Sequence, residues 1–215
     1  MITLTYQSLT DFSGLPAFRE AVTGGHPGLL VNNLPQLPSG IYVDAKHNIK
    51  LHKKDVSSPD QAMELMRTLH HYSQAIYNNL SHALELPWEK YLSEMHEFAA
   101  PSGDLLQTVD VEDRIPNEWS TLTLILSSSH PGTALVLFGT ALSVFSEGLT
   151  PELCHEGIDT QLLSGLSTQV GGKYVVYYAR PNDDVYYTRT AGALMTPLST
   201  SEYESRKRVK EVIAL

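Results

Sequence analysis

The chain has 215 residues, of which 42% are hydrophobic and 18% are charged, and its formal net charge is −9. This composition is typical of a globular protein whose core is large enough to fold without disulfides. The single cysteine, Cys154, excludes an internal disulfide. The negative charge argues against general nucleic-acid binding, which needs a basic surface. Since no apolar run is long enough to span a membrane and the N-terminus does not resemble a signal peptide, we expect a soluble cytoplasmic protein.

The first hundred residues combine strand and helix patterns. Residues 1–9 alternate like a strand, and residues 9–22 place apolar side chains at helical spacing behind capping residues. Residues 41–54 alternate like an exposed hairpin. The clearest helix covers residues 57–86, where a serine cap and a first-turn proline precede a stripe of apolar positions, and a shorter helix is expected over residues 88–98.

From residue 104 onwards the pattern favours strands. β-Branched and aromatic runs alternate with Pro, Gly, Ser and Asn, which is typical of strands joined by turns. The five runs are residues 104–111, 120–128, 133–139, 173–180 and 184–190. Because few helical crossovers separate them, an antiparallel sheet is favoured over a parallel one.

Together the patterns predict an α+β fold, in which a helical N-terminal half packs on an antiparallel jelly-roll-like (double-stranded β-helix) sheet. We expect one domain over residues 1–215, with a strand- and helix-rich part over 1–100, a β-rich barrel part over 104–198 and a C-terminal helix over 199–215. In that last segment four basic residues fall within five positions: Arg206, Lys207, Arg208 and Lys210. An amphipathic terminal helix and contact with an acidic partner both remain open.

Three carboxylates, Asp110, Glu112 and Asp113, crowd into four positions where a strand is expected. On a strand, Asp110 and Glu112 would share one face, about 7 Å apart, and Asp113 would point away. Two carboxylates on one face could bind a hard cation or act as an acid–base pair. They could equally form the polar side of an edge strand, where charge discourages aggregation.

Nine histidines and one cysteine are the other candidate ligands and nucleophiles. His71 and His82 are eleven residues apart on the expected long helix, about 16 Å along its axis, which is too far to share an ion. Cys154 precedes His155, but a histidine activates a thiol only where the ring and the sulfur converge. No phosphate-binding loop or nucleophile elbow is present in the sequence.

The order of elements resembles one known family. The opening helix and buried strand in residues 18–35, the strand-rich residues 109–139 and the closing strands in residues 171–192 are similar to those of the double-stranded β-helix oxygenases that use iron and 2-oxoglutarate. In that family a His-x-Asp/Glu pair on an early strand and a histidine on a late strand hold iron. An arginine on the final strands binds the cosubstrate.

The resemblance implies an oxidoreductase that acts on a small molecule with Fe(II) and 2-oxoglutarate. Where the family has its first pair, this chain reads Asp110-Val111-Glu112, so these carboxylates, with His155 as the nearest later histidine, are the implied metal ligands. Arg180 or Arg189 would lie near the cosubstrate, because a planar guanidinium pairs bidentately with a carboxylate. Tyr187, close to Arg189 in the sequence, is the second expected cosubstrate contact.

The alternative is a non-catalytic barrel that binds a small ligand, a protein partner or a second copy of the chain. It rests on tyrosines in the last strands: Tyr174, Tyr177, Tyr178, Tyr186 and Tyr187. Tyrosine buries a large area while keeping a polar end, so it suits cavities and interfaces. Alternation predicts that Tyr174 and Tyr178 lie on one face of their strand and Tyr177 on the other.

Overall fold

A computed structural model gives the fold, and its described parts are residues 1–35, 50–55, 61–86, 91–116, 118–127, 130–146, 150, 158, 163, 166, 172–187 and 198–200. The helices are α1 (Tyr6–Thr10), α2 (Leu15–Thr23), α3 (Gln61–Ala83), α4 (Thr140–Phe145) and the short 3-10 helix η2 (Lys53–Asp55). The strands are β1 (Ile2–Thr5), β2 (Gly28–Asn32), β3 (Lys50–His52), β4 (Leu105–Asp110), β5 (Leu122–Ser127), β6 (His130–Phe138), β7 (Lys173–Ala179), β8 (Tyr186–Tyr187) and β9 (Leu198–Ser199).

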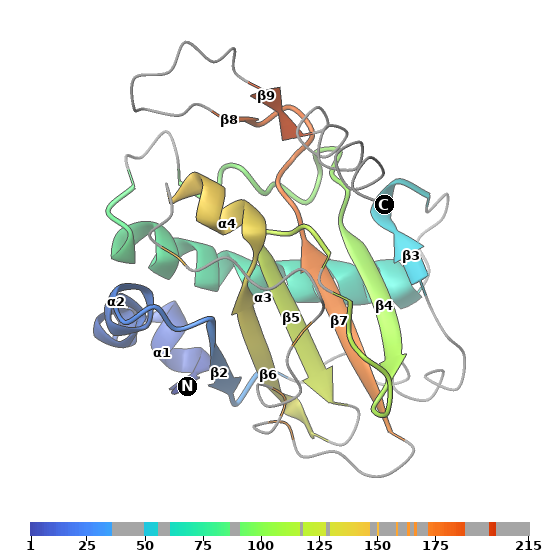
Figure 1. The fold of residues 1–215 in the computed structure, drawn as a ribbon, viewed down its shortest axis with the longest axis horizontal. Helices are drawn as coiled ribbons and strands as arrows, with labels where there is room; N and C mark the ends of the chain where they lie inside the picture. Colours follow the sequence, from blue (N-terminus) through green and yellow to red (C-terminus); the bar gives the residue numbers. More distant parts are fainter. Residues whose placement is uncertain are drawn as a thin grey trace, which may run out of the picture.

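Seven strands form one mixed sheet in the order β1-β2-β6-β5-β7-β4-β3 (Figure 1). Only β1 and β2 run parallel, and the other neighbours are antiparallel. The expected α+β class and the largely antiparallel sheet are confirmed. The N-terminal half adds three strands to the sheet as well as helices. Beside the large sheet, the described residues contain only the ribbon β8–β9, rather than a second sheet of similar size.

Each face of the sheet carries its own hydrophobic cluster, because side chains alternate along the strands. The helix-side cluster packs sheet residues such as Leu124, Val136 and Tyr177 against α1, α2 and α3. Figure 1 shows α3 crossing this face of the sheet. The opposite cluster contains Tyr174 and Tyr178. The predicted alternation of the tyrosines is therefore confirmed, and the sheet is buried on both faces.

A chain of hydrogen bonds ties α3 to the sheet beneath it. The Gln74 amide lies 3.0 Å from His70 Nε2, and His70 Nδ1 lies 3.5 Å from the Tyr177 hydroxyl. The hydroxyl donates to Asp104 at 2.9 Å, and the other oxygen of Asp104 accepts from the Arg180 amide at 2.7 Å. Burial raises the pKa of Asp104 and lowers that of His70 to about 4. This polar network fixes the register of α3 against β7.

Two expected elements have different boundaries or a different conformation. The strand expected over residues 1–9 ends at Thr5, whose side chain accepts a hydrogen bond from the Ser8 amide and caps α1. The helix expected over residues 88–98 is wrong from residue 91 onwards, where the chain forms turns. Here tertiary bonds replace helical ones, because the Asn182 amide donates to the Met95 carbonyl.

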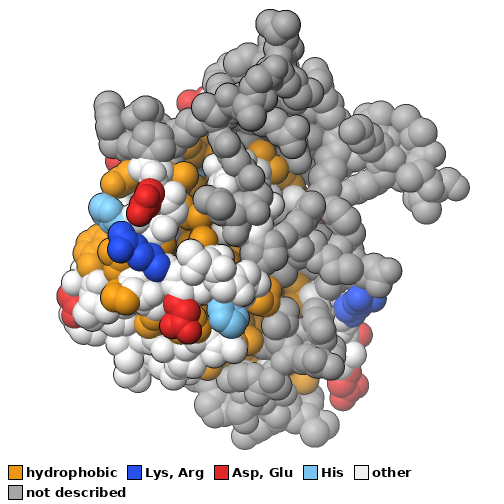
Figure 2. Space-filling model, turned by 60° about the vertical axis from the view of Figure 1, so that its left-hand side comes forward, with side chains coloured by type: hydrophobic (Ala, Val, Ile, Leu, Met, Phe, Trp, Pro, Cys, Tyr) orange, Lys and Arg blue, Asp and Glu red, His pale blue; other side chains and the backbone are white. Residues whose placement is uncertain are grey.

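Other expectations lie outside the described residues. These are residues 41–49 of the hairpin and residues 201–215 of the C-terminal helix. In the described part of the chain no helix is both long and apolar enough to cross a membrane. On the face that Figure 2 shows, acidic, basic and histidine side chains are interspersed with apolar ones among the coloured residues.

Candidate functional site

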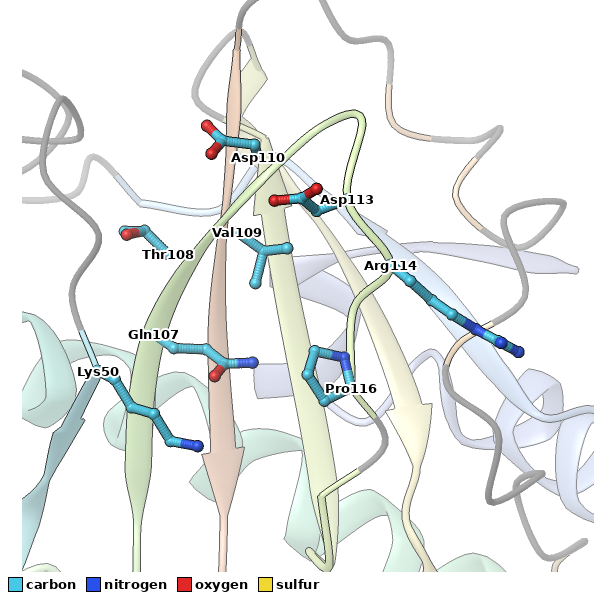
Figure 3. Close-up of a pocket in the computed structure, with 8 residues that line it drawn as sticks. All are labelled: Lys50, Gln107, Thr108, Val109, Asp110, Asp113, Arg114 and Pro116. Atoms are coloured by element: carbon cyan, nitrogen blue, oxygen red, sulfur yellow. The ribbon is translucent and has the colours of Figure 1, made fainter.

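A pocket of about 420 Å³ lies against β4 near the edge of the sheet (Figure 3). Its lining combines charged, polar and apolar side chains: Lys50, Gln107, Thr108, Val109, Asp110, Asp113, Arg114 and Pro116. Lys50 comes from the edge strand β3, and the last three residues belong to the segment that leaves β4. The pocket is thus formed where one strand and the chain that follows it separate.

Gln107 holds the centre of the pocket wall in place. It is 5% exposed, and its amide donates to the Tyr178 hydroxyl at 2.7 Å. That hydroxyl donates onwards to the Pro116 carbonyl at 2.7 Å, and burial raises the pKa of Tyr178. Because Tyr178 bridges both walls, the pocket is preorganised by the protein's own hydrogen bonds.

Alternation along β4 divides its side chains between the two faces of the sheet. Figure 3 shows Gln107 and Val109 pointing toward Pro116, and Thr108 and Asp110 pointing to the other side of the strand. The Asp110 carboxylate forms an ion pair of 2.7 Å with Lys173, its cross-strand neighbour on β7. Asp110 therefore stands at the rim of the pocket with its charge already compensated.

The second wall is the segment of residues 111–116. It begins with a turn in which the Asp113 amide donates to the Asp110 carbonyl at 2.9 Å. Ile115 then anchors the segment, because its side chain is fully buried and its carbonyl accepts from the Ile158 amide. The exposed Asp113 carboxylate points back toward β4, whereas Arg114 points away from the pocket (Figure 3).

This geometry corrects the expected arrangement of the three carboxylates. Strand β4 ends at Asp110, so Glu112 lies in the turn, exposed, and is not part of the pocket lining. The expectation that Asp110 and Glu112 share a strand face was wrong, because the turn begins one residue after Asp110. Asp113, which was expected to point away from Asp110, lies on the other side of β4, and both carboxylates line the pocket.

The remaining expected site residues are divided between the described and the other parts of the chain. His155 and Arg189 lie outside the described residues, and Tyr187 is placed in β8 by its backbone alone. Arg180 follows β7 and is buried, with a guanidinium nitrogen 3.4 Å from Glu118. It does not line the pocket.

The described residues do not fit the metal centre that the family resemblance implies. A facial triad needs two imidazoles and a carboxylate around one open site. Among the described residues no three His, Cys, Asp or Glu side chains lie close enough together to hold an ion. The candidate Asp110 is paired with Lys173 instead.

Comparisons with known proteins point to the fold rather than to a family. No family model and no curated protein matches the chain. A full-length Neurospora crassa protein, solved in complex with alpha-KG and 5-formyluracil, superposes with a TM-score of 0.61 at 10% identity, over 95% of this chain and 94% of that one. A Shewanella oneidensis protein named as an oxygenase gives 0.68 at 12% identity, over 100% of both chains.

A third solved structure, the rice dioxygenase for auxin oxidation, gives a TM-score of 0.63 at 8% identity, over 98% of this chain and 96% of that one. This chain has the fold of the 2-oxoglutarate/Fe(II) oxygenases. The expected resemblance in element order is confirmed, and identities this low show the fold alone.

Sequence reasoning named only the two carboxylates among the pocket residues; Gln107 and Lys50 are two of those that it missed. Gln107 had a visible signal, because it is the one amide in the apolar run "LLQTV" and had to be satisfied once that run became a buried strand. Lys50 had none, since only the pairing of Lys50 with Gln107 across β3 and β4 brings it to the site.

Proposed function

We propose that this chain is a small-molecule-binding protein built on the oxygenase fold, and that the pocket beside β4 is its binding site. The observation that carries the proposal is the bridge from Gln107 through Tyr178 to Pro116, which holds a polar cavity open between two walls. The cavity of about 420 Å³ falls within the usual range for small-ligand sites, roughly 300–1,000 Å³.

The side chains that line the pocket suit the binding of a small molecule. The Asp110 carboxylate is compensated by Lys173 at 2.7 Å, and Val109, Pro116 and the Gln107 amide line the pocket between Lys50 and Asp113. Such a mixture of apolar contact and few fixed polar groups orients a small ligand. No described residue in the pocket is a histidine or a cysteine.

The test fills the cavity with a side chain. Val109→Phe adds an aromatic ring to the pocket lining, and Val111→Phe makes the same change two residues away, outside the lining. We expect compounds from a metabolite library to raise the melting temperature of the unmodified protein. At a ligand concentration of 100 times Kd, the rise in melting temperature is roughly 5–10 °C. Val109→Phe should abolish this rise in melting temperature, and Val111→Phe should preserve it.

Circular dichroism and the ligand-free melting temperature of both variants control for folding. Binding that survives Val109→Phe in a folded protein would place the ligand elsewhere and overturn the proposal. A library that shifts neither the unmodified protein nor the variants would also count against it.

Iron-dependent oxygenation is a second candidate, favoured by the structural likeness to the Neurospora crassa protein, which was solved in complex with alpha-KG. For this chain it would require Asp110 to leave Lys173, and Glu112 and His155 to complete the ligand set. Arg189 and Tyr187 would then hold 2-oxoglutarate.

Elemental analysis after anaerobic incubation with Fe(II) tests this candidate. Stoichiometric iron that is lost in Asp110→Ala and Glu112→Ala, together with a melting-temperature rise on adding 2-oxoglutarate, would favour the oxygenase over the binding protein. A folded protein that takes up no iron would eliminate it.

A further inference from the structure

The pocket carries opposite charges at its two ends. Lys50 lies beside Gln107, its cross-strand partner, whereas Asp113 follows the end of β4 at Asp110. From Gln107 to Asp110 the strand advances by about 10 Å, at roughly 3.3 Å per residue. Figure 3 shows Lys50 and Asp113 at opposite ends of the lining, with Val109 and Gln107 between them.

The carboxylate end is available to a ligand. The Asp113 side chain makes no hydrogen bond or ion pair with another described residue, and it points toward β4 across the pocket (Figure 3). The neighbouring Asp110 is held by Lys173, so the two carboxylates do not compete for one cation. A cationic group in the pocket would find Asp113 as its partner.

The cationic end is also available. The Lys50 side chain is 59% exposed, and its contact with Glu118 is long, at 3.5 Å. An exposed pair of that length contributes little, so a ligand carboxylate can compete for the ammonium. Glu118 keeps a second partner, because it also lies 3.4 Å from Arg180.

We propose that the pocket binds a linear zwitterion, a molecule with an ammonium group at one end and a carboxylate at the other. The inference rests on the proposed function of the same pocket. The ammonium pairs with Asp113 and the carboxylate with Lys50, while the chain between them packs on Val109 and Pro116. Because the two charges are set off along a strand that advances by about 10 Å between Gln107 and Asp110, an ω-amino acid or short peptide is long enough to reach both and an α-amino acid is not.

The same two charges discriminate against small molecules that carry two negative charges. A dicarboxylate such as 2-oxoglutarate would place one of its charges near Asp113, where like-charge repulsion weakens binding. An amide in the middle of a peptide could donate to the side-chain oxygen of Gln107. The side-chain nitrogen of Gln107 already donates to Tyr178.

A chain-length series tests the distance. We would titrate glycine, 4-aminobutanoate, 6-aminohexanoate, 8-aminooctanoate and triglycine by calorimetry. Affinity should rise from glycine to a maximum at 6-aminohexanoate or 8-aminooctanoate, with triglycine near that maximum. Hexylamine and hexanoate, which each lack one charge, should bind at least tenfold more weakly than 6-aminohexanoate.

Two pocket variants assign the ends. Asp113→Asn should weaken the binding of 6-aminohexanoate and hexylamine about tenfold and leave the binding of hexanoate unchanged. Lys50→Met should weaken the binding of 6-aminohexanoate and hexanoate and leave the binding of hexylamine unchanged. Glu20→Gln and Lys54→Met remove charges outside the pocket lining and should change nothing.

The outcomes separate this inference from the function on which it rests. Three results would overturn the zwitterion proposal. These are equal affinity across the chain-length series, tighter binding of hexanoate than of 6-aminohexanoate, and no binding of any member. If a library compound of other chemistry still loses its binding on Val109→Phe, the pocket binds small molecules and only the ligand class is wrong. If no compound loses its binding on Val109→Phe, both the zwitterion proposal and the proposed function fail.

Discussion

His96 is fully buried between α3 and the sheet, and its ring is bonded on both sides. Nδ1 lies 2.6 Å from the Leu92 carbonyl, and Nε2 lies 2.7 Å from the Thr121 hydroxyl. A carbonyl only accepts, so Nδ1 carries the proton and Nε2 accepts from the hydroxyl. Burial lowers the pKa of His96 to about 3 and that of His70 to about 4. Both rings are neutral in the folded protein.

These two histidines predict an acid-sensitive fold. Their folded-state pKa values lie below the unfolded value near 6.5, so the unfolded chain binds protons first as the pH falls. Their contribution to stability is complete above pH 6.5 and decreases as the pH falls toward the folded-state pKa, about 4 for His70 and about 3 for His96. The urea concentration at the unfolding midpoint should fall as the pH is lowered from 7 to 4. The fall should be less steep in His70→Gln than in the unmodified protein. An unchanged slope in that variant would assign the sensitivity to other groups.

Individual pocket residues were only partly predictable from sequence. Asp110 was singled out because three carboxylates crowd into four positions, but as a metal ligand rather than as the partner of Lys173. Glu112 was wrongly placed on the strand, because β4 ends at Asp110 and the alternation of side chains stops where the turn begins. His70 contacts Tyr177 of β7, which bonds in turn to Asp104; both residues lie far from His70 in sequence, so local pattern could not reveal this network.

At the scale of elements, β2 packs closely against β6. Gly28 pairs with Leu137, and a Cβ at Gly28 would collide with the Val136 carbonyl and the Leu137 backbone. Backbone atoms of a central strand cannot shift without breaking the ladder on the other side. Gly132, in β6 itself, has open space where its Cβ would stand.

Gly28→Ala should therefore destabilise the protein by about 1–3 kcal/mol, as expected for overpacking a core. The matched Gly132→Ala should be neutral or stabilising by up to about 1 kcal/mol, because it only reduces the entropy of the unfolded chain. Urea denaturation of both variants measures the difference. Equal midpoints would show that β2 and β6 can separate to admit a methyl group.

The elements themselves were more predictable than their ends. Helical spacing located α3, and β-branched and aromatic runs located strands β4, β5, β6 and β7. The turns at residues 91–98 were predicted as a helix. There the deciding bond, from the Asn182 amide to the Met95 carbonyl, joins distant parts of the chain.

At the scale of the whole molecule, β7 unites two parts of the sheet. It lies between β5 and β4, and without it the order would separate into β1-β2-β6-β5 and β4-β3. Because strands from both halves of the sequence meet in one sheet, we expect a single cooperative unfolding transition for the chain. Sequence predicted the strand but not this central place, which depends on pairing between distant segments.

A chain truncated after Ser146 keeps six of the seven strands of the sheet and lacks β7. We expect it to lose the cooperative transition, since two sheet edges and both core faces would be exposed. Thermal denaturation followed by circular dichroism, with the full chain as reference, measures this. A sharp transition in the truncated chain would show that β1-β2-β6-β5 folds with α3 alone.

The central position of β7 also bears on how the protein is made. A ribosome delivers the strands in chain order, so the last strand of the large sheet to emerge is the one that joins its parts. Until residue 179 has left the exit tunnel, the nascent chain holds β4 and β5 with open edges and their apolar side chains in water. Such a chain is a natural client for chaperones that bind during synthesis, and a pause in translation before residue 173 would lengthen its exposure.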